Sequence, residues 1–343
     1  MKRLLFFVLL AGCAKAEPEP EIKRVSVMTF NVENLFDTKH DPDKNDLAFL
    51  PLAGKETREH KTACQKMKRA LYRDQCLEWD WSSETLAVKM KRLGKVILSV
   101  GDGRGPDILL LQEVENKAIL ERLRTGPLAD AGYGPGLLLE ANDARGIDQA
   151  ILTRLPVVSG PTLYRDAGGT LTRGLLIAGL SLPDGTVLQT GVVHFPSPAA
   201  PRRLREGGLR ILNNYRQRIS SASLMLVGGD FNITAEEEAE FRVFARLAGE
   251  QWALAHELGC KKCPGTHYYA PKKSWSFLDV VLISKNMDPN GSAPWTIDAA
   301  SVRLVDSARG QKDKRGRPLR FDPMDRTGIS DHFPLVVDLV KRR

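Results

Sequence analysis

The sequence has little of what several protein classes require. The apolar run at residues 4–10 is too short to span a bilayer permanently, and no segment repeats along the chain. Gly101-Asp-Gly-Arg-Gly105 follows a helical pattern and leads into a strand, which is the wrong order for a dinucleotide-binding turn. His256-Glu257 lacks the second histidine of a zinc protease motif. These absences argue against a repeat protein and against those two enzyme classes.

The composition is that of a globular protein with a large core. The chain has 343 residues, of which 42% are hydrophobic and 27% charged. Its net charge of +8 favours a polyanionic partner, because clustered Lys and Arg attract phosphate. Removing the first twelve residues takes away only Lys2 and Arg3, so most of this excess remains.

The N-terminus is predicted to be an export signal. A basic start and the short apolar run lead to Leu10-Ala11-Gly12-Cys13, which resembles a bacterial lipoprotein box. We expect residues 1–12 to be cleaved, Cys13 to be lipidated, residues 13–24 to form a Pro/Glu-rich tether, and residues 25–343 to form one catalytic domain. The alternative is an ordinary signal peptide ending near Ala16. Ala14 lacks the acidic character that retains lipoproteins at the inner membrane, so an outer-membrane anchor is favoured, facing the periplasm or the exterior.

The remaining four of the five cysteines are expected to form disulfides. In an oxidising compartment, proximity in sequence favours Cys64–Cys76 and Cys260–Cys263 among the three possible connectivities. A four-cysteine zinc site is the competing interpretation, because Cys260-Lys-Lys-Cys263 has ligand spacing.

Alternating strand and helix patterns indicate an α/β class with large sheets. Short apolar runs bounded by polar residues predict strands. They lie at residues 25–30, 108–111, 150–152, 175–182, 187–195, 224–227, 278–283 and 335–340. Apolar spacings of three and four predict helices over 86–100 and 236–247. Residues 37–80, 201–210 and 306–328 interrupt these patterns and are expected to be surface loops or insertions.

Chemistry-bearing side chains cluster where the strands end. They are Asn31, Glu113, His194, Asp230 and Asn232, joined near the C-terminus by Asp279 and by Ser330-Asp331-His332. In open α/β sheets the strand ends form the ligand-binding crevice. These residues supply oxygen ligands for a hard cation and two imidazoles for proton transfer.

In sequence order, four blocks resemble those of the endonuclease/exonuclease/phosphatase superfamily. They are Phe30-Asn31-Val32-Glu33-Asn34, Leu111-Gln112-Glu113-Val114, Gly228-Gly229-Asp230-Phe231-Asn232 and Ser330-Asp331-His332. The resemblance covers about residues 25–340. It implies a four-layered sandwich, in which two packed mixed β-sheets are flanked by helices, and magnesium-dependent phosphoester hydrolysis. The segment Val192-Val193-His194-Phe195 is similar to deoxyribonuclease I-like enzymes, although the insertion around Cys64 and Cys76 departs from them.

The resemblance also implies roles for individual residues. Glu113 and Asn31 hold Mg²⁺, with Mn²⁺ or Ca²⁺ as alternatives, and Asp331 holds a second ion. His332, oriented by Asp279, is the general base, and Asp230 positions the water. His194, oriented by Asp148, protonates the leaving oxygen, while Asn232 and Arg173 bind the phosphate.

The expected activity is that of a nuclease, with DNA as the favoured substrate. Two basic clusters, Arg202 to Arg210 and Arg309 to Arg320, either grip the nucleic-acid backbone or are solvated loops. The alternatives are hydrolysis of lipid or sugar phosphates within the same superfamily and an inactive binding lipoprotein. The sequence is silent on oligomeric state.

Overall fold

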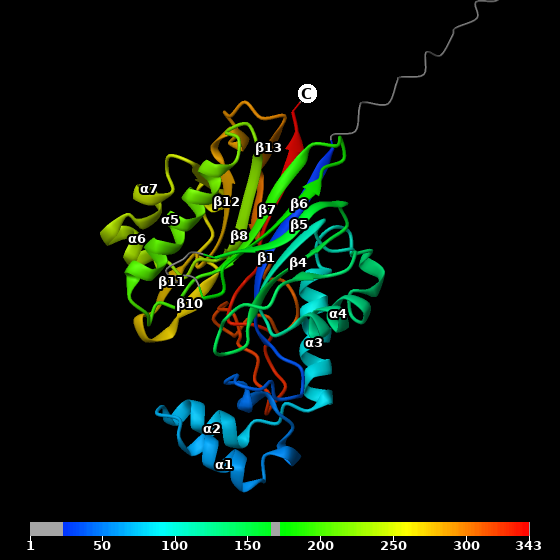
Figure 1. The fold of residues 1–343 in the computed structure, drawn as a ribbon, viewed down its shortest axis with the longest axis vertical. Coiled ribbons are helices and arrows are strands. Elements are labelled where there is room, and N and C mark those ends of the chain that lie inside the picture. The colour runs from blue at the N-terminus through cyan, green and yellow to red at the C-terminus, as the bar shows by residue number, and fades with distance from the viewer. Residues whose placement is uncertain (1–22, 166–171, 343) are drawn as a thin grey trace, which may run out of the picture.

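The computed structural model describes residues 23–165 and 172–342, which form two packed β-sheets with helices on their outer faces (Figure 1). The first sheet has six strands in the order β13-β14-β1-β2-β4-β3. They are β13 (Trp295–Leu304), β14 (Leu335–Lys341), β1 (Arg24–Leu35), β2 (Ile108–Val114), β4 (Asp148–Thr153) and β3 (Leu137–Leu138). Only β1 and β2 are parallel among these paired strands, so the sheet is mixed.

The second sheet also has six strands, in the order β5-β6-β7-β8-β12-β9. They are β5 (Val157–Tyr164), β6 (Leu175–Ser181), β7 (Val187–His194), β8 (Leu224–Asp230), β12 (Asp279–Ser284) and β9 (Trp252–Leu254). Here β7 and β8 are parallel and the other described pairs antiparallel. A separate hairpin pairs β10 (His267–Tyr269) with β11 (Ser274–Ser276).

Helices cover both sheets and extend beyond one end of them. The α-helices are α1 (Arg58–Gln65), α2 (Ala70–Glu78), α3 (Ser83–Ile97), α4 (Lys117–Thr125), α5 (Arg202–Arg218), α6 (Ala235–Phe241), α7 (Val243–Leu247) and α8 (Ala255–Leu258). The short 3-10 helices are η1 (Leu47–Phe49), η2 (Leu52–Gly54), η3 (Ala129–Ala131), η4 (Ala270–Lys272) and η5 (Lys285–Met287).

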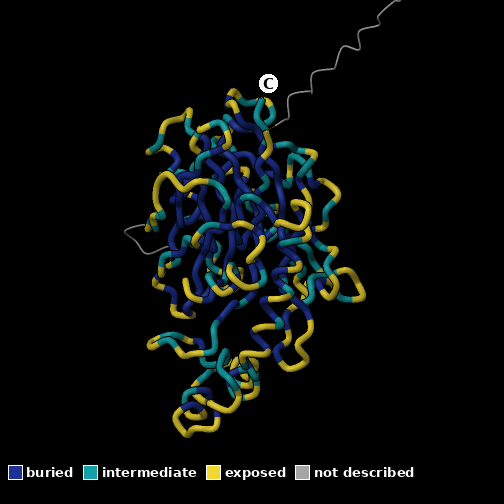
Figure 2. The backbone as a smooth tube through the Cα atoms, turned by 90° about the vertical axis from the view of Figure 1, so that its right-hand side faces the viewer, coloured by how far each residue is buried: buried dark blue, intermediate teal, exposed yellow. Residues whose placement is uncertain are grey.

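Three apolar layers hold this sandwich together. The central one lies between the sheets and includes Leu110, Leu226 and Val337. The outer two pack α3 and α4 on the first sheet and α5 to α7 on the second. Figure 2 shows the buried interior and, at its lower end, a largely exposed extension. The predicted four-layered sandwich is therefore confirmed.

The predicted strands are all present, but two helical regions differ from expectation. Residues 201–210 are not a loop, because α5 begins at Arg202 and buries Leu209 and Leu212. A Cβ on Gly208 of this helix would lie 2.6 Å from the Phe195 ring, so glycine is needed there for packing. Residues 236–247 are two helices, interrupted at Arg242 with φ +49°.

Both expected disulfides are present, and the two ends of the domain lie together. Cys64 pairs with Cys76 and Cys260 with Cys263. Arg24 at the start of β1 pairs with Val340 near the end of β14. The predicted signal peptide, Cys13 and nearly all of the tether lie outside the described residues. Across residues 23–165 and 172–342, no helix has both the length and the apolar character needed to cross a membrane.

Candidate active site

Two neighbouring bulges in the first sheet create the site. The β1–β2 register passes from Asn31↔Gln112 to Leu35↔Val114, with Glu33 and Asn34 at φ +52° and +59°. Glu113 also leaves the ladder, at φ +65°. Such left-handed backbone is costly for non-glycine residues and concentrates at functional sites. It brings the side chain of Asn31 and that of Glu113 together at the strand ends.

An amide and two carboxylates form the centre of the site. Asn31 Nδ2 donates to Asp230 Oδ2 at 3.1 Å and approaches Glu113 Oε1 at 3.5 Å. The backbone N–H of Asn34 donates to Glu113 Oε2 at 3.0 Å. Burial raises the pKa of Glu113, but Arg145, 3.4 Å away, together with Arg173 and His332, leaves that pKa below its usual value. Glu113 is therefore an anion suited to binding a hard cation, and sequence reasoning missed Arg145.

His332 lies near Asp230 and is tied to Asp279, the β12 residue that pairs with Asp230. Its Nδ1 lies 2.7 Å from Asp279 Oδ2, and both side chains are buried. Ser330 Oγ donates to the carbonyl of Asn31 at 2.7 Å and accepts from the N–H of His332, fixing this loop on β1. Burial lowers the pKa of His332, but Asp279, with Asp331 and Asp230 adding to it, holds that pKa well above its usual value. The predicted Asp279–His332 pair is present, with an imidazolium rather than a neutral ring.

His194 reaches the same carboxylates without its predicted partner. Its Nε2 lies 3.5 Å from Asp230 Oδ2 and 3.9 Å from Glu113 Oε1, while Nδ1 has no partner among the described residues. Burial, Arg173 and Arg145 hold the pKa of His194 well below its usual value. The charges of the two histidines are thus opposite to those expected for a His332 base and a His194 acid.

The predicted orientation of His194 by Asp148 is wrong. Asp148 begins β4, and its Oδ1 accepts from the N–H of Ala141 at 2.9 Å. Burial and Glu140 raise the pKa of Asp148 to about 8, so the group is mostly neutral at pH 7. A side chain committed to its own sheet's loop does not hold a histidine of the opposite sheet.

The two expected phosphate ligands are partly occupied by protein groups. Arg173 pairs with Asp143 at 3.0 Å and donates to the carbonyl of His194 at 3.4 Å, with Nε unpartnered in the described chain. Asn232 has φ +54°, and its Nδ2 donates to the carbonyl of Phe195 at 3.1 Å. Both residues lie at the site, and each keeps a donor for a ligand.

An ion network beside Asp331 joins the exposed Arg320 to buried groups and was not predicted. Arg320 lies 2.6 Å from both Glu33 and Asp331. Glu33 also accepts from the N–H groups of Phe321 and Asp331. Lys89 is fully buried on α3 and donates to the carbonyl of Ile329 at 2.6 Å. The one sequence signal for this network was Lys89, a lysine on the apolar face of the predicted helix over 86–100. Arg320 already pairs with Asp331, the residue expected to bind a second ion.

His267 joins this edge of the site. Its ring centroid is 4.9 Å from that of His332, and the two residues form an isolated β-bridge. Burial and His332 lower the pKa of His267 to about 4, so it is neutral at pH 7. Its place at the start of β10 was not predicted from sequence.

Six of the ten cations in the two basic clusters form ion pairs within the described residues. Arg205 is buried against Glu237, and Glu206 accepts Arg202 and Arg246. In the 306–328 segment, Lys312 pairs with Asp306 and Arg317 with Asp313. These pairings favour a structural role for most of these cations.

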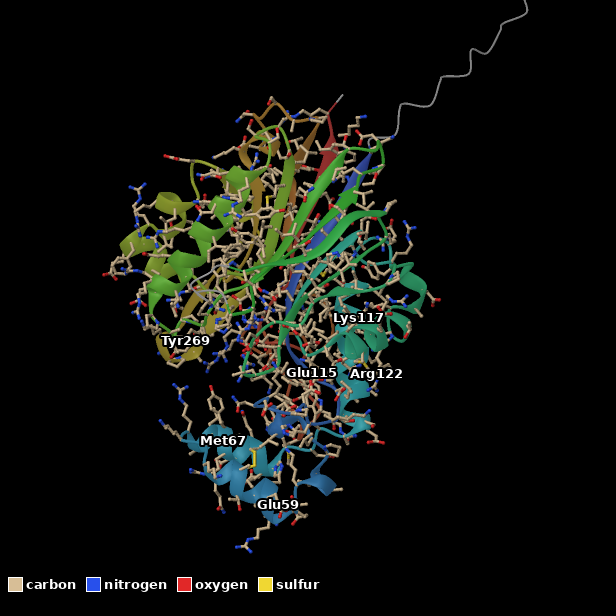
Figure 3. The ribbon with its side chains drawn as sticks, in the orientation of Figure 1. Glu59, Met67, Glu115, Lys117, Arg122 and Tyr269 are labelled. Atoms are coloured by element: carbon tan, nitrogen blue, oxygen red, sulfur yellow. A yellow bond between two sulfur atoms is a disulfide. The ribbon has the colours of Figure 1, made fainter. Side chains whose placement is uncertain are left out.

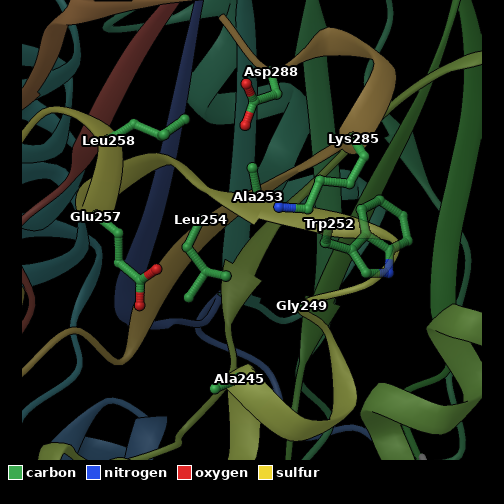
Figure 4. Close-up of a pocket in the computed structure, with 9 residues that line it drawn as sticks. All are labelled: Ala245, Gly249, Trp252, Ala253, Leu254, Glu257, Leu258, Lys285 and Asp288. Atoms are coloured by element: carbon green, nitrogen blue, oxygen red, sulfur yellow. The ribbon is translucent and has the colours of Figure 1, made fainter. Parts of the chain in front are cut away.

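A separate hollow lies away from these residues. It is lined by Trp252, Leu254, Glu257 and Lys285, among others, around β9 and α8 (Figure 4). It shares no residue with the cluster of Asn31, Glu113, His194, Asp230 and His332, so the chemistry belongs to the strand ends.

Comparisons with known proteins agree with this geometry. A sequence model of the "Endonuclease/Exonuclease/phosphatase family" matches residues 74–341. A search of curated proteins finds no match. Humanized D. rerio TDP2 has a TM-score of 0.57 and 15% identity, covering 92% of this chain and 98% of its own. D. rerio TDP2 complexed with single strand DNA product has a TM-score of 0.55 and 17% identity, covering 92% and 98%. A family protein from Bacteroides thetaiotaomicron has a TM-score of 0.55 and 12% identity, covering 94% and 100%. These structures share the fold.

Proposed function

The chain belongs to the endonuclease/exonuclease/phosphatase family, and on that premise we propose that it is a divalent-metal-dependent nuclease with DNA as its preferred substrate. One observation carries the proposal: Asn31, Glu113, Asp230, His194 and His332 converge at the strand ends of both sheets. The blocks that hold them are far apart in sequence. Their convergence assembles cation ligands and proton-transfer groups around one point.

The donor set fits Mg²⁺ or Mn²⁺ better than a softer metal. Glu113 would hold the ion with the free lone pair of Asn31 Oδ1, which also accepts the N–H of Glu33, because carboxylate and amide oxygens suit a hard cation. No thiolate lies in this cluster of described residues. When bound, such an ion would neutralise the charge that builds on the phosphoryl oxygens.

The protein's own groups would handle the protons. Asp230, hydrogen-bonded to Asn31 and close to the neutral His194, would accept the proton of the attacking water. His332, kept cationic by Asp279, would donate a proton to the leaving oxygen. The N–H groups of Asn232 and Arg173 would bind the phosphoryl oxygens. This assignment reverses the direction of proton transfer expected from the sequence.

Plasmid nicking tests the proposal. The full chain should relax supercoiled DNA in Mg²⁺, EDTA should stop it, and His332→Ala should lower the rate about 10²- to 10⁴-fold. His256→Phe is the matched control, because it removes a half-buried histidine outside the cluster. Absence of cleavage by the folded protein with Mg²⁺ or Mn²⁺ would overturn the nuclease function and direct the search to lipid and sugar phosphates.

We also propose that the chain is exported and anchored through Cys13, with residues 25–343 as one catalytic domain. The two disulfides are typical of oxidising compartments. β1 begins at Arg24, which lies seven residues before Asn31 in the strand. At the rise of a β-strand this places Arg24 roughly 20 Å from Asn31, at the end of the sheet opposite the site. An anchor there would leave the site facing away from the membrane, which favours a water-borne substrate over a lipid. Membrane fractionation of the wild type and Cys13→Ser tests the anchor; equal release of both into the soluble fraction would contradict it.

A further inference from the structure

A small lobe extends beyond the end of the sheets that carries the active site. It consists of α1, α2 and their connection, residues 58–78, and lies at the bottom of Figure 1. Figure 3 shows Met67 in this lobe, with Glu115, two residues after Glu113, on the facing end of the body. Of the two helices, only His60, Cys64 and Cys76 are buried, and the disulfide joins the helices. The lobe is thus crosslinked covalently and exposes most of its other residues.

The root of the lobe is built into the wall of the site. Trp81, just after α2, donates its Nε1–H to the carbonyl of Phe36 at 3.1 Å. Phe49 stacks on Phe36 with centroids 4.0 Å apart, and Trp81 meets Phe321 edge-on at 5.8 Å. Phe36 follows Asn34 by two residues, and the N–H of Phe321 donates to Glu33. The lobe is therefore fixed relative to the cation ligands by aromatic packing.

The stretch 66–73 presents cations and apolar groups to solvent together. Lys66, Lys68 and Arg69 are exposed, and none has an acidic partner within salt-bridge distance in the described residues. Leu71 is 61% exposed and Tyr72 49% exposed. Arg69 lies over the Tyr72 ring, 5.7 Å from its centroid.

We propose that this face of the lobe binds a single-stranded stretch of nucleic acid leading to or from the active site. The inference rests on the proposed nuclease function and names a substrate form for it. Lysines contact the phosphates of a strand, while an exposed aromatic ring offers a stacking platform to unpaired bases. A merely solvated helix face explains the cations but not the outward Leu71 and Tyr72, which α2 leaves exposed while it buries Cys76.

Binding of a fluorescent single strand to the EDTA-treated full chain tests the inference without catalysis. The strand should have about 20 nucleotides, longer than typical single-strand site sizes. Tyr72→Ala should weaken binding about 5- to 100-fold, and Tyr72→Phe should restore it, because the ring stacks. Lys66→Glu with Lys68→Glu should reduce the slope of log affinity against log salt by about 1.4, the value for two phosphate contacts on a single strand.

Matched controls separate the lobe from net charge and from the active site. Lys23→Glu with Arg218→Glu makes the same change of charge at exposed positions at the other end of β1 and of α5. Hydrolysis of the small ester bis(p-nitrophenyl) phosphate reports on the active site alone, because this ester is too short to reach the lobe. The lobe variants should keep the wild-type rate on it.

The outcomes are distinguishable. Weaker binding by the lobe variants, with unchanged binding by the control variants, supports the inference. Absence of phosphodiester hydrolysis by the wild type would overturn the proposed function but would leave this binding result valid. Equal binding by lobe and control variants overturns the inference. Equal affinity of the chain for duplex and single-stranded DNA would also overturn the inference. So would stronger binding of the chain to anionic phospholipid vesicles than to the single strand, because neither result requires unpaired bases.

Discussion

Asp279→Asn is the sharpest test of how the site moves protons. The substitution keeps the shape of a fully buried side chain 2.7 Å from Nδ1 of His332 and removes only its charge. Asp279 is the main group that raises the pKa of His332. An opposite charge at this range shifts a pKa by about 1–3 units. The variant should therefore lower the pKa of His332 by about that amount.

The direction of the pH change identifies the role of His332. A proton donor must be protonated, so its pKa sets the basic limb of the profile of kcat/KM against pH. In Asp279→Asn that limb should move about 1–3 pH units lower, and at pH values above the new limb the rate on DNA should fall about tenfold for each pH unit of the shift. The rate of hydrolysis of bis(p-nitrophenyl) phosphate should fall much less, because p-nitrophenolate leaves without needing a proton.

Several results would refute this reasoning. A shift of the acid limb instead would make His332 the base, and equal losses on both substrates would exclude proton donation. Asp279→Asn with His332→Ala should be no slower than His332→Ala alone, since Asp279 acts through His332. Asp338→Asn is the control, because Asp338 is a buried aspartate paired with Arg24 at the other end of the sheet.

Three further predictions concern the metal, acid stability and backbone. Glu113→Gln should remove Mn²⁺ binding measured by electron paramagnetic resonance; undiminished binding would place the ion elsewhere. Burial lowers the pKa of His256 to about 4 in the folded protein. Between pH 6.5 and 4 the unfolded chain therefore binds a proton at His256 that the folded protein does not, and the free energy of unfolding should fall as the pH falls through this range. His256→Phe should remove up to about 3 kcal/mol of this loss of stability. Urea unfolding of both proteins at pH 6.5 and 4 measures it, and an unchanged dependence of stability on pH would contradict the prediction. Gly229→Ala should destabilise the folded protein by at least about 3 kcal/mol. Gly229 has φ +153°, and a Cβ there would lie 2.0 Å from the carbonyl oxygen of Val193. Gly54→Ala, with open space around it, should change stability by less than about 0.5 kcal/mol; equal losses would refute the steric reasoning.

The strands and most of the site were predictable because both follow from short stretches of sequence. A buried strand is a contiguous apolar run, and the polar residue that ends it marks the edge of a sheet. Asn31, Glu113, His194 and Asp230 each end such a run, so four local patterns indicated one site. The disulfides were predictable for a similar reason, since each joins cysteines close in sequence.

The errors concern contacts that depend on packing between distant segments. The ion pair of Glu33 with Arg320 links residues 287 positions apart in the chain, and no local pattern relates them. Whether Asp148 meets His194 depends on the packing of the two sheets and on the loop that holds Ala141. The direction of the histidine pKa shifts depends on every nearby charge, including Arg145.

The left-handed backbone of Glu33 and Glu113 has a consequence for how this lineage can change. Each residue holds a conformation that costs about 1–3 kcal/mol for a side chain with a Cβ, so glycine at either position would relieve strain while deleting a carboxylate. Selection for activity opposes that exchange, whereas selection for heat resistance alone favours it. Among descendants of this chain, glycine at these two positions should therefore mark the branches in which catalysis has been abandoned.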